Sequence, residues 1–144
     1  MQHCGAQRGW WKTLILFYLG GMSYVCLEWL WRGWSHPSMF LLGGICFVLL
    51  GGLNEGLRPD LPLWLQGLVG GILVTALELG CGLIVNVGLG LNVWDYSDMP
   101  LNFLGQICLP FTLLWIPLSI AAVLADDWLR HLLFGEPAVH HRLW

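Results

Sequence analysis

Two acidic residues, Glu28 and Glu78, stand inside long apolar stretches of the chain. A carboxylate inside a bilayer is costly unless it is protonated or paired, so such a glutamate is a candidate for binding or moving an ion, a proton or a polar solute. Glu28 has an evident partner, because Arg32 follows it by one helical turn in the favourable acid-then-base order. We expect both carboxylates to face the interior of a helical bundle.

Glu78 belongs to a series of small and polar residues that recur at spacings of three and four: Gly67, Gly71, Thr75, Glu78, Gly82 and Asn86. On a helix this spacing forms a single stripe. Small residues let another helix approach closely, and polar residues bond across the contact. Two interpretations stay open for this stripe: helix packing around a satisfied polar residue, or a path for an ion, a proton or a substrate.

The densest polar cluster of the sequence runs from Asn92 to Asn102. It contains Trp94, Asp95, Tyr96 and Ser97, and its composition predicts a turn before the last apolar segment. Such a loop could dip back into the bundle, because non-helical backbone is tolerated at membrane depth when protein or water surrounds it. The alternative is an ordinary surface loop whose Trp and Tyr anchor it at the membrane interface.

These residues carry a family resemblance. The chain resembles a family of small bacterial membrane proteins named putative ABC-transporter type IV, whose members combine an intramembrane glutamate, a Trp-Asp-Tyr-Ser segment, and then Asn and Gly at the head of the last helix. The matching residues here are Glu78, Trp94 to Ser97, Asn102 and Gly105, and Glu28 matches a glutamate late in the family's first helix. The chain departs from the family in its compact first connection, residues 32–37. The resemblance implies an association with transport.

Other chemistries lack the residues they need. The chain is 57% hydrophobic and only 10% charged, with a net charge of -3, which argues against a soluble domain and against a nucleic-acid surface. No phosphate-binding or dinucleotide motif is present, so we expect no cofactor. The five cysteines are scattered singly and His140-His141 lacks a third ligand, so we expect no metal site. No nucleophile is paired with a base, so we expect no enzyme.

Four apolar segments must position the polar residues: 14–31, 39–57, 63–91 and 101–125. A membrane-crossing helix needs about 20 such residues, so we predict an all-α, polytopic four-helix transmembrane bundle in one domain, 1–144, with a cytoplasmic tail over 128–144. The third segment has 29 residues, more than a crossing needs. We therefore expect its last turns, around Asn86 to Gly90, to be irregular.

Basic residues predict the orientation of the bundle. With four crossings Arg32 falls alone on one side, and the other side carries Arg8, Lys12, Arg58, Arg130 and Arg142. This bias places both termini in the cytoplasm. The resemblance to a bacterial family implies that the membrane is the bacterial cytoplasmic membrane. Most tryptophans fall at predicted helix ends, as expected for headgroup anchors, whereas Trp115 falls at mid-membrane and is expected to pack against a neighbouring helix.

An internal repeat is also suggested. Gly20-Gly21 and Leu27-Glu28 recur at an offset of 50 residues as Gly70-Gly71 and Leu77-Glu78, and residues 42–46 resemble residues 104–108. The pattern predicts a duplicated helical hairpin related by an axis normal to the membrane. Chance similarity between Gly- and Leu-rich segments is the alternative.

Two functions follow. In the first, the chain is a transport-associated, permease-like component in which Glu28, Glu78 and the Asp95 region form a polar site, and protonation of Glu78 gates its occupancy. In the second, it is a non-catalytic membrane adaptor or assembly subunit whose glutamates serve helix packing. A chain with four short membrane crossings and no ATP-binding module cannot by itself be a complete ATP-driven transporter. Besides lipid, we therefore expect a second copy or other membrane subunits as partners, and the sequence leaves the substrate open.

Overall fold

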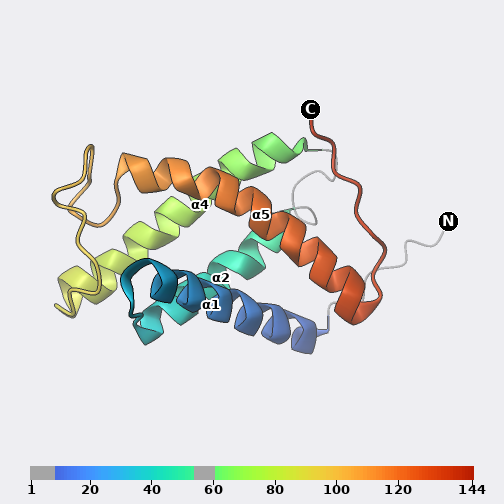
Figure 1. Cartoon of the computed structure of the whole chain (residues 1–144), viewed down its shortest axis with the longest axis horizontal. Helices are drawn as coiled ribbons and strands as arrows, with labels where there is room; N and C mark the ends of the chain where they lie inside the picture. The colour runs from blue at the N-terminus through green and yellow to red at the C-terminus, as the bar shows by residue number, and fades with distance from the viewer. Residues whose placement is uncertain (1–8, 54–60) are drawn as a thin grey trace.

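Four α-helices and one π-helical turn form the part of the chain that the structure, a computed structural model, describes: residues 9–53 and 61–144. The helices are α1 (Trp10–Arg32), α2 (Pro37–Gly51), α4 (Leu63–Gly82) and α5 (Leu109–Phe134), and the π-turn η1 (Leu83–Gly88) continues α4 (Figure 1). The described residues contain no strand, only an isolated bridge between Phe103 and Ile107. The predicted all-α class is confirmed.

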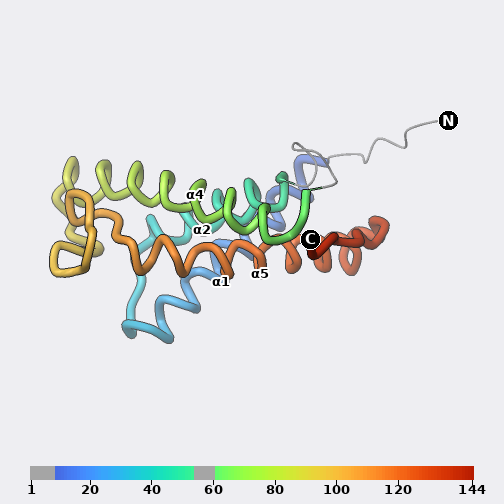
Figure 2. The backbone as a smooth tube through the Cα atoms, turned by 90° about the horizontal axis from the view of Figure 1, so that it is seen from above, coloured from blue at the N-terminus to red at the C-terminus, as the bar shows by residue number. Residues whose placement is uncertain are grey.

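The helices alternate in direction. The start of α1 and the end of α5 lie at one end of the molecule, and the connection from η1 to α5, residues 89–108, lies at the opposite end (Figures 1 and 2). Helices α1 and α2 pack as one hairpin and α4 and α5 as another, and α2 touches both helices of the second hairpin. We call residues 89–108 the outer connection.

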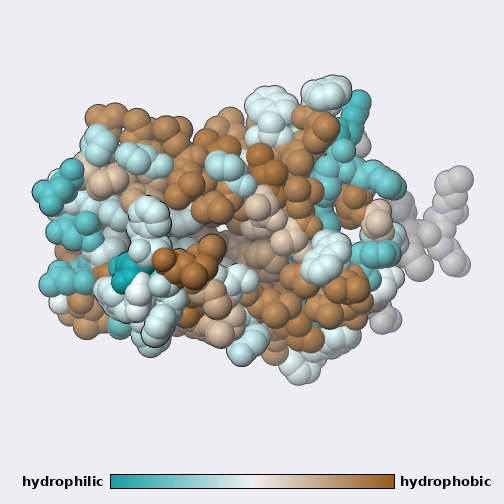
Figure 3. Space-filling model, viewed as in Figure 1, coloured by the Kyte–Doolittle hydropathy of each residue, from teal (hydrophilic) through white to brown (hydrophobic). Residues whose placement is uncertain are grey.

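The outside of this bundle is apolar. Three helical stretches are long and apolar enough to cross a membrane: Trp10–Arg32, Leu63–Gly88 and Leu109–Phe134. Figure 3 shows a lateral face covered largely by hydrophobic residues. The described part of α2 has 15 residues, about 22 Å of helix, which is shorter than a hydrocarbon core of about 30 Å. Residues 54–57 of the predicted second segment lie outside the described residues.

Glycines set the close contacts within each hairpin. A Cβ atom on Gly21 would lie 2.6 Å from the carbonyl oxygen of Phe40 in α2, and one on Gly71 would lie 2.8 Å from Ile116 in α5. Both glycine pairs of the predicted repeat therefore face the second helix of their own hairpin. The other half of the repeat is not matched, because residues 42–46 belong to α2 whereas residues 104–108 precede α5.

The last helix begins later and ends later than the predicted range of 101–125. Its start at Leu109 fits a proline in the first helical turn, and the left-handed φ angles of Leu101 (51°) and Leu104 (54°) exclude a helix before it. Its end at Phe134 is capped by Gly135, with a φ of 65°. The predicted boundaries were wrong because the polar residues after 125 form helical pairs, such as Arg130 with Asp126 at 2.7 Å, instead of ending the helix.

The predicted tail, 128–144, is correspondingly part helix and part docked chain. Residues 128–134 belong to α5. The remaining segment returns to the start of α4, where the backbone amide of Leu63 donates to the carbonyl oxygen of Arg142 at 2.7 Å. His141 lies 2.7 Å from Asp127. The C-terminal segment is thus held against the bundle.

The third apolar segment changes its helical form at its end. From Leu83 the backbone forms a π-turn that ends at Gly88, and the chain turns at Gly90, whose φ is 66°. This confirms the expected irregular last turns. The turn directs the outer connection back over the bundle, since the amide of Leu91 bonds to the carbonyl oxygen of Val85 at 3.0 Å.

Candidate functional site

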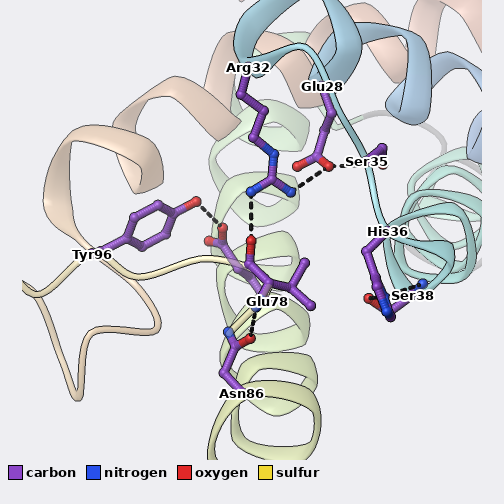
Figure 4. Close-up of polar contacts among 9 residues, drawn as sticks. Glu28, Arg32, Ser35, His36, Ser38, Glu78, Asn86 and Tyr96 are labelled. Atoms are coloured by element: carbon purple, nitrogen blue, oxygen red, sulfur yellow. Dashed lines mark hydrogen bonds and ion pairs between the residues drawn. The ribbon is translucent and has the colours of Figure 1, made fainter. Parts of the chain in front are cut away.

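Glu78 lies in the middle of the bundle and is only 3% exposed. Its Oε1 accepts a hydrogen bond from the hydroxyl of Tyr96 at 3.0 Å, and its Oε2 accepts one from the indole Nε1 of Trp115 at 3.0 Å. Figure 4 shows Tyr96 of the outer connection pointing at the carboxylate on α4. Within the described residues, the cations that form ion pairs do so with other acids. Glu78 is therefore held by neutral donors from two other elements.

The two donors are positioned by aromatic stacking. The ring of Tyr96 stacks on Phe111 with a centroid distance of 4.8 Å, and the ring of Trp115 stacks on Tyr24 of α1 at 6.1 Å. The expected packing of Trp115 against a neighbouring helix is thus confirmed. Its indole also provides a bond to Glu78 that the sequence did not reveal.

The small and polar stripe of α4 faces α5 and the outer connection; the spacing predicted the stripe but not the elements that it faces. Thr75 contacts Thr112 of α5 through a hydrogen bond of 3.3 Å between their hydroxyl groups. A Cβ atom on Gly82 would lie 2.5 Å from Oε1 of Gln106. The stripe therefore holds the second hairpin together and leaves Glu78 near its centre.

Glu28 and Arg32 form the predicted pair, at 2.7 Å. Arg32 also donates from Nη1 to the carbonyl oxygen of Val93 at 2.7 Å, and its guanidinium lies 4.2 Å from the ring centre of Trp34. Glu28 accepts a second hydrogen bond from Ser35 at 3.0 Å, because the left-handed Gly33 turns the chain back toward α1. The pair thus connects the end of α1 to the outer connection (Figure 4).

Asn86 of η1 binds the outer connection from the other side. Its Oδ1 accepts the amide of Val93 at 2.7 Å, and its Nδ2 donates to Oε1 of Gln106 at 2.8 Å. The indole of Trp94 donates to the carbonyl oxygen of Gln106 at 3.0 Å. Val93 and Trp94 are buried, at 2% and 9% exposure. The first part of the connection therefore packs into the bundle, which favours the first of the two interpretations of this loop.

Asp95, Ser97 and Asn102 shape the exposed turn of the connection. The Asp95 carboxylate accepts hydrogen bonds from the hydroxyl and the amide of Ser97, which hold the pKa of Asp95 below its usual range. Asn102 donates to the carbonyl oxygens of Ser97 and Met99, each at 3.0 Å. Gly105 has a φ of 68°, and a Cβ atom there would lie 2.7 Å from the Ser97 hydroxyl, so this position requires glycine.

A cavity of about 260 Å³ lies beside Glu78. Its walls come from α1, α2, α4 and α5 and are mostly apolar. Of the nine candidate residues, Glu28, Arg32, Glu78, Asn86, Trp94, Asp95, Tyr96, Ser97 and Asn102, Glu78 alone lines it. The structure therefore joins Glu78 to Tyr96, Glu28 to Arg32, and Asn86 to the backbone of the outer connection. It does not bring Glu28, Glu78 and Asp95 into one cavity.

Four contributors were missing from the predicted site: Tyr24, Trp115, Ser119 and Gln106. Trp115 had a signal, because it is the tryptophan that the predicted segments placed at mid-membrane. Gln106 had a weaker signal in the sequence, because it is a polar residue directly after Gly105 of the family motif. Tyr24 and Ser119 come from helices far apart in sequence and gave no signal of their own.

One carboxylate in apolar and aromatic surroundings defines what this site can do. Each carboxylate oxygen accepts more than one hydrogen bond, so Glu78 keeps acceptor capacity toward the cavity beyond its two protein donors. In the described residues no three His, Cys, Asp or Glu side chains group as metal ligands would. A proton or a ligand with its own N–H donors suits a single carboxylate better than a metal ion, which takes several protein oxygens.

The comparisons with known proteins agree with the motif. A family model described as putative ABC-transporter type IV matches residues 15–134. No curated protein and no solved structure matches the chain. The matched range includes Glu28, Glu78, the whole outer connection and Trp115.

Proposed function

The chain belongs to the putative ABC-transporter type IV family, and we propose that it is a transport-associated, permease-like membrane component in which the Glu78 carboxylate is the polar site on the path of the transported species. Its long apolar helices fit a membrane protein of this kind. One observation carries the proposal: Glu78 is buried at the wall of a cavity whose other walls are mostly apolar.

The Glu78 carboxylate is energetically costly at its buried position. An ionisable side chain at membrane depth lowers stability compared with an apolar one, and such residues are therefore retained where they bind or relay something. The donors Tyr96 and Trp115 reduce this cost and fix the orientation of the carboxylate. A fixed orientation toward a cavity is what a binding or relay site needs.

Partners and location form part of the proposal. ATP-driven transport requires an ATP-binding partner, and a second copy or other membrane subunits would complete the assembly within the lipid. Lys12 lies in the first turn of α1, Arg130 lies near the end of α5, and Arg142 bonds to the start of α4, whereas Arg32 is the last residue of α1. This distribution supports a cytoplasmic membrane location with both termini in the cytoplasm. We assign no catalytic step to the chain itself.

A second candidate function has an observation of its own. Because both oxygens of Glu78 accept hydrogen bonds from other elements, the residue also ties α4 to α5 and to the outer connection. This geometry suits a non-catalytic adaptor or assembly subunit, in which Glu78 serves packing alone.

Proton flux into proteoliposomes separates the two functions. The full chain is reconstituted with the pH-sensitive dye pyranine inside, and a potassium diffusion potential drives the flux. The transport proposal expects Glu78→Gln to elute from size exclusion like the wild type and to lose most of the flux seen above protein-free vesicles. Asp98→Asn, which removes an acid from the exposed turn, is the matched control and should keep it. Equal flux in wild type and Glu78→Gln would reject the proposal. Wild-type flux no higher than that of protein-free vesicles, together with aggregation of Glu78→Gln, would favour the adaptor.

A further inference from the structure

We propose that the cavity beside Glu78 binds a small amphipathic organic amine, with its ammonium group on the Glu78 carboxylate and its apolar body among the helices. The inference rests on the proposed function, because it names the class of molecule that the polar site would take. Binding itself is measured separately from transport, so the two can fail independently.

Size is the first argument. An apolar cavity of about 150 Å³ holds benzene. The cavity here, at about 260 Å³, therefore has room for one ring and a short chain. Its apolar walls include Leu42 and Cys46 of α2, Val74 of α4, and Leu118 and Ala122 of α5. These side chains suit a hydrocarbon body.

Charge is the second argument. Among the residues that the structure describes, the lining contains one acid, Glu78, and no lysine, arginine or histidine. A ligand that carries its own ammonium group supplies the missing counter-ion and the N–H donors that the remaining carboxylate lone pairs accept. The stacked rings of Tyr24 and Trp115 also line the cavity, and aromatic faces attract such a cation.

An unpartnered hydroxyl is the third argument. Ser119 of α5 is 1% exposed and lines the cavity, yet its Oγ has no hydrogen-bond partner within residues 9–53 and 61–144. A helical serine commonly bonds to the carbonyl of the preceding turn, and a buried hydroxyl without a partner is destabilising. Ser119 follows Trp115 by one turn, about 6 Å along the helix. A second polar group on the ligand, away from the amine, would pair with it.

Access is the fourth argument. Figure 3 shows a hollow near the middle of the lateral face, where Figure 1 places α1 and α5 on either side. Leu27 of α1 and Ala121 of α5 line the cavity and are exposed on the outside of the bundle. In a membrane this opening faces lipid chains, into which an amphipathic amine partitions. Entry from the bilayer therefore fits both the mouth and the ligand class.

Equilibrium binding to the full chain in lipid nanodiscs tests the proposal. The probe is tritiated 2-phenylethylamine, followed by scintillation proximity, with 2-phenylethanol as a neutral competitor of the same shape. We expect saturable binding that excess unlabelled amine displaces, and displacement by the alcohol that is at least about tenfold weaker because it lacks the charge. Equal competition by amine and alcohol, or uptake that stays linear with concentration as in empty nanodiscs, would overturn the proposal.

Variants assign the binding to the cavity. Glu78→Gln should weaken amine binding about tenfold or more, and Asp98→Asn should not change it. Ala122→Leu should abolish it by filling the cavity, whereas Leu114→Phe, at an exposed position of α5 outside the lining, should leave it intact. Tyramine carries a hydroxyl at the far end of the ring, and its affinity relative to 2-phenylethylamine should fall in Ser119→Ala.

Two outcomes separate this inference from the proposed function. Saturable amine binding by the wild type, together with unchanged proton flux in Glu78→Gln, would keep the inference and reject transport. Loss of flux in Glu78→Gln without saturable amine binding would keep transport and reject the inference. Saturable binding that survives in both Glu78→Gln and Ala122→Leu would overturn the inference, because the amine would then bind elsewhere. Cross-links showing that a second copy fills the opening between α1 and α5 would overturn it as well.

Discussion

At the scale of single residues, the polar side chains act as connections between elements. Glu78 joins α4 to Trp115 and Tyr96, and Arg32 joins α1 to the backbone of Val93. The sequence predicted that Glu78 would face inward, because an acid in an apolar stretch has few other options. It could not predict the donors, since hydrogen bonding between residues far apart in the chain depends on the packing of whole helices.

The turn around Asp95 gives a prediction at this scale. The Ser97 hydroxyl, and then its amide, stabilise the charged Asp95 carboxylate and lower its pKa. Because the pKa of Asp95 is lower in the folded chain, the ionised carboxylate stabilises the fold at pH values above the usual pKa of an aspartate. This stabilisation is lost as the pH falls through the lowered pKa. Ser97→Ala removes the hydroxyl, so the pKa of Asp95 should rise toward its usual value. Carbon-13 NMR titration of the labelled carboxyl group measures it, and an unchanged midpoint would contradict this account of the turn.

At the scale of elements, α4 is organised by its small and polar stripe. The sequence showed this stripe because helical spacing is a local property, and the structure places it against α5 and the outer connection. The beginning of α5 was not predictable in the same way. Residues 101–108 are apolar enough for a helix, yet the left-handed residues Leu101 and Leu104 and the bonds of Asn102 keep them in a folded loop.

Two glycines of α4 provide a matched test of the stripe. Gly82 faces Gln106, and a methyl group there would lie 2.5 Å from its side-chain oxygen, whereas a methyl group on Gly80 would meet no atom within 4 Å. Gly82→Ala should destabilise the protein by about 1–3 kcal/mol through overpacking. Gly80→Ala should leave stability unchanged or raise it by up to about 1 kcal/mol, because alanine favours a helix. Thermal unfolding in detergent checks both, and equal midpoints for the two variants would show that the stripe is not a tight contact.

At the scale of the whole molecule, the alternating helices place the outer connection opposite both the start of α1 and the end of α5 (Figure 1). The apolar segments and their order could be predicted from the composition of the sequence and from its turn residues. The docking of the C-terminal segment could not be predicted, because the bond between Leu63 and Arg142 joins backbone groups and the pair of His141 with Asp127 forms only once the segment has folded back.

Labelling of single cysteines tests the orientation. In a cysteine-free background, Asp98→Cys marks the outer connection and Val139→Cys marks the C-terminal segment, and both positions are exposed. A membrane-impermeant maleimide added to intact spheroplasts should label Asp98→Cys at once and Val139→Cys only after lysis. The reverse pattern would invert the orientation, and labelling of both before lysis would contradict opposite sides.

The central claim is that the charge of Glu78, and not merely its fit between Tyr96 and Trp115, is what the protein uses. The most direct test compares Glu78→Asp, which keeps the charge on a shorter side chain, with Glu78→Gln, which keeps the size and loses the charge. Proton flux into pyranine-loaded proteoliposomes is measured for both, next to the wild type. The account predicts that Glu78→Asp retains much of the flux and that Glu78→Gln falls to the level of protein-free vesicles. Flux that survives in Glu78→Gln and is lost in Glu78→Asp would contradict it and show that Glu78 serves packing.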